Sequence, residues 1–432
     1  MHKRLFYLDN LKTFALLLGV LFHTSIVYAP SIGYAIKSDE LHYFFTILVH
    51  LIHVFRMPLF FFLSGFFSYM VLNKHGGRNF TFSRFERMFA PLLVGLFFFS
   101  PVQYFLVYNQ KHSPISFWEY YPRFFSTEEF DLSHIWFLVY LFLYSFVLLM
   151  DHKFHLFERI SSSSYFGTRK HFKKIHFKLT VNFSPNLILY LKAVLYCFAP
   201  VLIVNWFFNK DDSYLRIQPV SFTYYLAYFM IGVISYKNSL LQNVNSLRIK
   251  NIFHSIGIIL LFAIFLYLSE IDPYWMNFTF DSKRIFIRVF HWLIDNLLAW
   301  SIIFSLLSLF QKYLDHTSPT LDHLRNSGMS IYLLHHPISL ILANFLLKVN
   351  IPIFLKFSNC FLTKNIKLLR ICFVKVYITT IIQFSVNSVI FKLLLCRVLS
   401  IFTNKFNEIL SLLCLTLKKQ IYKPFFKWVY PV

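Results

Sequence analysis

Apolar runs of nearly twenty residues recur along this chain, and they constrain its fold more than any other feature. A helix needs about 20 apolar residues to cross a hydrocarbon core of about 30 Å. A backbone inside a bilayer must satisfy its own hydrogen bonds, and the alternating pattern of a β-barrel is absent here. The residues are 57% hydrophobic and only 14% charged, far from the balance of a soluble domain. The sequence therefore predicts an all-α, polytopic membrane helix bundle.

We expect about ten transmembrane helices in this bundle. No internal repeat accompanies them, which disfavours a carrier built from duplicated halves. The tenth of the expected spans has the weakest pattern. They lie at residues 11–29, 44–72, 88–108, 134–150, 187–207, 222–236, 252–269, 289–310, 329–347 and 371–396.

The net charge of +23 first raises the question of a nucleic-acid partner. The cations lie mostly between the apolar runs, which is the distribution of a topology signal. With the N-terminus inside, the inner segments carry 19 Lys and Arg residues and the outer loops carry 8. We therefore expect a multi-pass protein of the inner, cytoplasmic membrane with a cytoplasmic N-terminus. We expect membrane lipid as a partner, with anionic lipid near the basic inner loop 151–188. We expect no nucleic-acid partner.

An ionisable side chain inside a span is costly, so by default it is a functional candidate. The stretch "KTFALLLGVLFH" begins at Lys12 and ends at His23. Eleven residues are about 16 Å along a helix and nearly three whole turns, so both side chains project from one face. This spacing connects the inner surface with the membrane interior along one stripe. A hydrogen-bonded histidine and a lysine reaching the headgroups would also fit the pattern.

Further polar residues lie at similar depth in other spans. In "HVFRMPLFFFLSGFF", Arg56 lies about 18 Å below the outer surface, and Pro58 predicts a kink or a broken turn beside it. In "SIYLLHHPI", His335 and His336 are adjacent. Adjacent helical residues project about 100° apart, so at most one of the two is expected to share a site with His23.

Two shorter stretches flank these spans. Asp9 precedes Lys12 in "YLDNLK" at the expected inner mouth, and His134 and Trp136 open the fourth span in "LSHIWFLVYL". A lone tryptophan there would be an interfacial anchor.

These stretches together resemble the acyltransferase 3 family of integral membrane acyltransferases, and most closely its glucan-biosynthesis branch. The ordered pieces that carry the resemblance are "RLFYLDNLKTFALLLGVLFH", "FRMPLFFFLSGFF", "FSRFERMFAPLL", "HIWFLVYLFLYS" and "MSIYLLHHPI", over about residues 4–345. The family pattern of a basic residue, ten residues and a histidine falls on Lys12 and His23. The basic residue is usually arginine, and lysine keeps the charge but lacks the planar fork that grips phosphate.

The resemblance implies transfer of an acyl group, of acetyl or succinyl type, from cytoplasmic acyl-CoA to a hydroxyl of a glycan or lipid-linked sugar. No bound cofactor and no metal is expected; acyl-CoA is the donor substrate. Neutral histidine suits the removal of a hydroxyl proton, and a buried arginine suits a developing oxyanion. We therefore assign catalysis to His23, Arg56 and His335. Substrate binding is assigned to Asp9, Lys12, Arg84, Arg87, His134, Trp136 and His336.

Two questions stay open at this point. A proton-coupled transporter that uses the intramembrane His and Arg residues is the alternative function.

The acyltransferase domain is expected over residues 1–350. Residues 351–432 lack the family pattern and carry twelve Lys or Arg residues from 355 onward with one acid, Glu408. They are either a divergent last helix with a basic tail or the product of a reading-frame shift.

Overall fold

A computed structural model describes residues 4–34, 36–126, 130–154, 185–208, 212–214, 216–241, 282–347 and 352–358. The chain divides into two units, residues 1–373 and 374–432, and every described residue lies in the first. Within the described ranges all regular elements are helical, apart from one isolated bridge between Tyr214 and Ile217. The all-α prediction is confirmed for this part of the chain.

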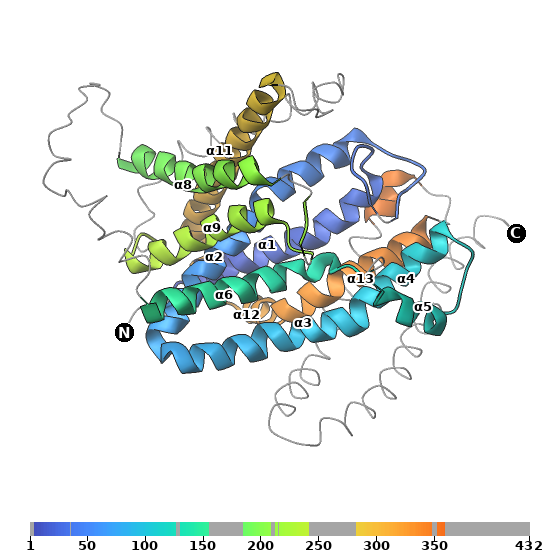
Figure 1. Cartoon of the computed structure of the whole chain (residues 1–432), viewed down its shortest axis with the longest axis horizontal. Helices are drawn as coiled ribbons and strands as arrows, with labels where there is room; N and C mark the ends of the chain where they lie inside the picture. Colours follow the sequence, from blue (N-terminus) through green and yellow to red (C-terminus); the bar gives the residue numbers. More distant parts are fainter. Residues whose placement is uncertain are drawn as a thin grey trace, which may run out of the picture. The chain divides into compact units, whose positions relative to one another are not determined.

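The helices follow one another in a long series (Figure 1). The N-terminal half contains α1 (Phe6–Ser25), η1 (Ile26–Tyr28), α2 (Tyr43–Arg84), η2 (Phe85–Phe89), α3 (Ala90–Val94), η3 (Gly95–Phe99), α4 (Ser100–Lys111), α5 (Phe117–Phe124), η4 (Ser133–Ile135) and α6 (Trp136–Phe154). The later helices are α8 (Pro185–Phe207), α9 (Pro219–Lys237), α11 (Ser282–Tyr313), α12 (Pro319–Asn326) and α13 (Gly328–Leu346).

Eight of the ten predicted spans coincide with helices of this series. In the described part, five helical stretches are long and apolar enough to cross a membrane: Phe6–Tyr28, Tyr43–Lys111, Ser133–Lys153, Trp292–Tyr313 and Gly328–Leu346. The predicted spans at 187–207 and 222–236 lie on α8 and α9, which are not among the five. The spans at 252–269 and 371–396, and most of loop 151–188, lie outside the described residues. The number ten therefore stays a prediction.

The stretch from Tyr43 to Lys111 contains 69 residues, which as one helix would be roughly 100 Å long. A hydrocarbon core is only about 30 Å thick, so this stretch must cross it twice. The helical backbone is interrupted at Gly76, where φ is +73° and ψ is 168°. The chain reverses direction there, within α2 (Figure 1), so the second and third predicted spans form a helical hairpin.

The break in α2 is not where the sequence placed it. Pro58 lies inside α2, and the backbone keeps helical dihedral angles there. The predicted broken turn beside Arg56 is wrong, and the alternative of a kink stays a prediction. Proline removes a single donor and is tolerated in a membrane helix when neighbouring elements satisfy the freed carbonyl. A positive φ is accessible to glycine at little cost, which explains why the reversal occurs at Gly76.

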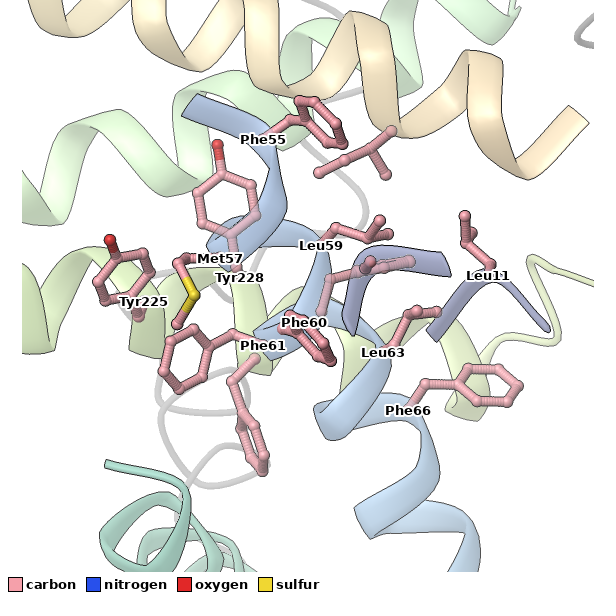
Figure 2. Close-up of a cluster of buried hydrophobic side chains, with 14 of the residues drawn as sticks. Leu11, Phe55, Met57, Leu59, Phe60, Phe61, Leu63, Phe66, Tyr225 and Tyr228 are labelled. Carbon is pink, nitrogen blue, oxygen red and sulfur yellow. The ribbon is translucent and has the colours of Figure 1, made fainter. Parts of the chain in front are cut away.

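The core lies around α2, which packs against α1, α6, α9 and α11. Figure 2 shows buried α2 side chains between Phe55 and Phe66, with Met57 and Phe61 on the side of Tyr225 and Tyr228 of α9. The two helices approach closely at a pair of glycines. An added Cβ would lie 1.9 Å from the Phe229 oxygen at Gly65 and 2.0 Å from the Phe62 oxygen at Gly232. Small residues permit this contact between membrane helices.

Candidate active site

Four histidine rings gather where α1, η4 and α13 meet. The His23 ring centroid lies 5.1 Å from that of His335 and 4.3 Å from that of His336. The His134 centroid lies 5.5 Å from that of His335 and 5.0 Å from that of His336. The fold thus brings together residues that are more than 300 positions apart in the sequence.

Both adjacent histidines belong to this cluster, so the expectation that at most one would share the site with His23 is wrong. His335 and His336 are buried in the middle of α13. Their side chains project about 100° apart, but His23 from α1 and His134 from η4 each lie within 5.5 Å of both rings. A single partner ring can therefore contact both adjacent histidines.

A hydrogen-bonded network fixes the outer side of the cluster. The His336 Nδ1 atom is hydrogen-bonded to Gln103 Oε1, and its Nε2 lies 2.9 Å from the hydroxyl of Tyr34. Gln103, buried in α4, also accepts a 2.7 Å hydrogen bond from the Ser133 hydroxyl, and its Nε2 lies 3.5 Å from His134 Nδ1. This amide connects two histidines that belong to different elements.

His335 is held by the backbone of its own helix. Its Nδ1 lies 2.6 Å from the carbonyl oxygen of Tyr332 and 3.1 Å from that of Ile331. A carbonyl oxygen only accepts, so Nδ1 carries the proton and Nε2 is the accepting nitrogen of the neutral ring. Tyr332 in turn donates a 2.5 Å hydrogen bond to the carbonyl oxygen of His134, which ties α13 to η4.

Arg56 projects from α2 toward the same region. Its side chain is 8% exposed, and its guanidinium carbon lies 4.6 Å from the ring centroid of Phe22. Gly19 of α1 provides the space beside it: a Cβ there would lie 2.7 Å from Arg56 Nη1 and 3.5 Å from His335 Nε2. No acidic residue pairs with Arg56 among the described ion pairs.

Three buried polar atoms of this region have no hydrogen-bond partner in the described part of the chain. They are His23 Nδ1, His134 Nε2 and Arg56 Nε. A buried polar group without a partner costs about 1–3 kcal/mol, and more when it is charged. Three such groups in one cluster are the pattern of a site that a polar ligand completes.

A second group of cations lies toward the N-terminal end of α1. Lys12 is exposed and interacts electrostatically with Arg84 and Arg87 and with one acid, Asp9. Arg84 lies over the ring of Phe80, 4.7 Å from its centroid, and its Nε is buried without a partner. Three cations with one nearby carboxylate favour binding of an anion.

Asp9 forms ion pairs with arginines other than those of the Lys12, Arg84 and Arg87 group, and these pairs hold the N-terminal end of α1 in place. Its Oδ2 lies 3.0 Å from Arg4 Nη2 and 4.0 Å from Arg325 Nη1. Arg325 also pairs with Asp322 at the exposed face of α12. A hydrogen bond from Thr317, with Arg325 alongside, lowers the pKa of the Asp322 carboxyl below its ordinary value. The ion pairs of Asp9 support a structural role beside its assignment to substrate binding, which stays a prediction.

Trp136 lies in an aromatic group next to the site. Its ring centroid is 5.5 Å from that of Tyr225 and 6.2 Å from that of Phe61. Tyr225 interacts electrostatically with Arg56, which connects Trp136 to the site through one intermediate residue.

Sequence reasoning missed Gln103, Tyr34 and Gly19. Gln103 carried a usable signal, because an amide within the apolar run "FFFSPVQYFLV" is costly unless it has partners. Tyr34 lies in a loop and Gly19 among ordinary helical residues, and neither shows a pattern that points to the cluster.

The family model described as "Acyltransferase domain" matches residues 5–382 of the chain. The chain belongs to this family. Glucans biosynthesis protein C of Escherichia coli O6:K15:H31 (strain 536 / UPEC) is 24% identical over 346 residues, which are 78% of this chain and 83% of that protein. The protein of the same name from Escherichia coli (strain K12) is 24% identical over 343 residues, with the same coverage. No solved structure matches.

Family membership and the apolar helices make the chain a multi-pass membrane acyltransferase that transfers groups other than aminoacyl groups. The resemblance found in the sequence is confirmed. The matched range extends past residue 350, and the division at that residue stays a prediction. The roles of the individual site residues stay predictions as well.

Proposed function

We propose that the chain transfers an acetyl- or succinyl-type group from cytoplasmic acyl-CoA to a hydroxyl of a glycan or lipid-linked sugar, with His23 as the general base. The observation that carries this proposal is the group of unpartnered polar atoms on His23, His134 and Arg56. An acyl-transfer site needs a basic nitrogen for the hydroxyl proton and a cationic donor for the oxyanion, and these atoms are of those two kinds.

The proposed reaction divides among three groups. His23 takes the proton of the acceptor hydroxyl as its oxygen attacks the thioester carbonyl. Arg56 stabilises the negative charge that develops on the carbonyl oxygen, and the CoA thiolate leaves and recovers a proton. His335, with its proton held on Nδ1, presents its accepting nitrogen beside Arg56 and assists the proton transfer.

The cation group of Lys12, Arg84 and Arg87 is proposed to bind the phosphates of the donor. Lys12 is about 16 Å from His23 along α1, which separates the anionic end of acyl-CoA from its thioester. This assignment places the N-terminal end of α1 at the cytoplasmic face of the inner membrane. Family membership favours this enzyme over the proton-coupled transporter considered from the sequence.

The first prediction tests the base and the donor site together. With purified full-length chain, radiolabelled acetyl- or succinyl-CoA and a glucose oligosaccharide, His23→Ala should lower transfer per folded molecule about 10²–10⁴-fold. Lys12→Ala should raise the KM for acyl-CoA with less effect on kcat. Lys12→Arg should keep activity, because a guanidinium retains the charge and adds bidentate contacts.

His152→Ala is the matched control, since His152 is an exposed histidine in the last turn of α6. It should leave both rate and yield unchanged. Near-normal turnover in folded His23→Ala would contradict the assigned base. A loss of abundance with normal specific activity would make His23 a structural residue instead.

A further inference from the structure

A polar pocket of about 510 Å³ lies beyond the histidine cluster, toward the end of the bundle opposite Lys12. Its lining comes from three segments: the loop after η1, the last turns of α4 and the last turns of α13. The lining residues are Asp39, Leu106, Asn109, Gln110, Asn344 and Leu347.

The same three segments carry the outer side of the candidate active site. The loop supplies Tyr34, α4 supplies Gln103 and α13 supplies His336. His336 is hydrogen-bonded to both of the others. From Gln103 to Gln110 is about 10 Å along α4, and from His336 to Asn344 is about 12 Å along α13. Leu106 of α4 packs against the hydrophobic cluster that contains Leu340 and Ala343 of α13. The pocket and the outer side of the candidate active site therefore lie on the same three segments, about 10–12 Å apart along the helices.

The pocket offers hydrogen-bonding groups of both kinds. Gln110 Nε2 donates a 2.9 Å hydrogen bond to Asn344 Oδ1. This bond leaves the Gln110 carbonyl as an acceptor and an Asn344 N–H as a donor, beside the exposed Asp39 carboxylate. The Asn109 amide is already used on the backbone of Ile115 and keeps its loop in place.

This chemistry suits a neutral ligand with several hydroxyl groups. Each hydroxyl both donates and accepts, so it can pair with a carboxylate, an amide carbonyl and an amide N–H at once. Leu106 and Leu347 offer apolar contacts for the C–H faces of a sugar ring. The Asp39 carboxylate repels phosphate groups, so the anionic donor is not the ligand expected here.

We propose that this pocket binds the saccharide acceptor and directs a hydroxyl toward His23 and His336, an inference that rests on the proposed function. Donor and acceptor then enter from opposite ends of α1: the donor at the Lys12 group, the acceptor at the pocket formed by the loop after η1, α4 and α13. The histidine cluster lies between them.

Binding without catalysis tests this pocket. The full-length chain is placed in nanodiscs, because detergents with sugar headgroups would compete, and binding of a β-linked glucose tetrasaccharide is measured calorimetrically without acyl-CoA. Asp39→Asn and Asn344→Leu should each weaken binding at least tenfold. Lys111→Ala, an exposed position on the last turn of α4, should change nothing.

The outcomes separate the two proposals. Unchanged binding in both pocket variants, or no saccharide binding by the unmodified chain, would overturn the pocket even if acyl transfer is observed. Weakened binding in the pocket variants supports the pocket, even where no acyl transfer can be measured and the proposed reaction fails. Melting temperatures equal to that of the unmodified chain would show that the variants are folded.

Discussion

The four histidines of the cluster differ in what their ring nitrogens contact, and these contacts separate their chemical roles. The Nδ1–H group of His335 donates a hydrogen bond to a backbone carbonyl oxygen. Both ring nitrogens of His336 are hydrogen-bonded, one to Gln103 and one to Tyr34. His23 keeps a buried Nδ1 without a partner in the described structure. A general base needs an accepting nitrogen that the protein has not occupied, which favours His23 and His134, whose Nε2 is also without a partner in the described structure, over His335 and His336. Of these two, His23 lies on α1, the helix that also carries Lys12.

Gly19 gives the second prediction. A methyl group at this position would lie 2.7 Å from Arg56 Nη1, so Gly19→Ala should displace the guanidinium from its place beside His335. Misplacement of a catalytic group by about 1 Å can cost about 10²-fold in rate. We expect transfer per folded molecule to fall by a factor of that order, measured with labelled acyl-CoA at saturating acceptor.

Gly77→Ala is its matched control, because the added Cβ would meet only a Leu149 side-chain atom at 3.8 Å. It should leave the rate unchanged. Normal transfer by Gly19→Ala would mean that Arg56 can move without loss, which would contradict its assignment to the oxyanion.

The sequence predicted the site only where a residue type was costly in its setting. His23, Arg56, His134 and His335 stood out because ionisable groups in apolar runs need a reason. Tyr34 is an ordinary loop residue, and the packing of α13 against α1 and η4, which admits both His335 and His336, is a tertiary property. Neither could be predicted from local pattern.

Among the elements, the crossing of α2 and α9 most directly limits what the bundle accepts. At Gly232 an added Cβ would lie 2.0 Å from the Phe62 carbonyl oxygen, a backbone atom that cannot turn away. The third prediction is that Gly232→Ala forces the two helices apart and lowers the melting temperature, since overpacking typically costs about 1–3 kcal/mol. Folded yield and melting temperature in detergent measure the effect, with Gly77→Ala again as control. An unchanged melting temperature would show that α9 shifts freely against α2.

The hairpin from α2 to α4 shows why element ends were harder to predict than elements. Apolar length identified both limbs, but the segment between the predicted spans 44–72 and 88–108 is largely helical, with its interruption at Gly76. The pair Gly76 and Gly77 was the available signal, because glycine enters the positive-φ region at little cost. Pro58 drew attention instead, although a proline within a packed membrane helix need not break it.

At the scale of the whole molecule, the proposed path needs a fixed orientation in the membrane. The fourth prediction is that loop 109–133 faces outward and loop 151–188 faces the cytoplasm, as the bias of 19 against 8 Lys and Arg residues indicates. In a cysteine-free background, a membrane-impermeant thiol reagent should modify Ser126→Cys in intact cells and spare Ser163→Cys. Modification of the second variant alone would reverse the orientation and with it the assignment of the donor end.

The last prediction concerns how far the functional chain extends. Phe357 packs on Phe45, with ring centroids 5.0 Å apart, and Lys356 Nζ lies 3.6 Å from Glu40 Oε1. These contacts hold the segment that contains Lys356 and Phe357 against α2 and against the loop that carries Tyr34 and Asp39.

The family match ends at residue 382. A chain that stops after Ile382 should keep its transfer rate per folded molecule. A chain that stops after Phe354 should lose both yield and transfer, because burial of one large aromatic side chain is worth roughly 1.5–3 kcal/mol.

Full activity in the shorter chain would show that everything after residue 354 is dispensable, as a reading-frame shift would produce. Loss of activity in both chains would show that residues after 382 are needed, as a tenth span at 371–396 requires.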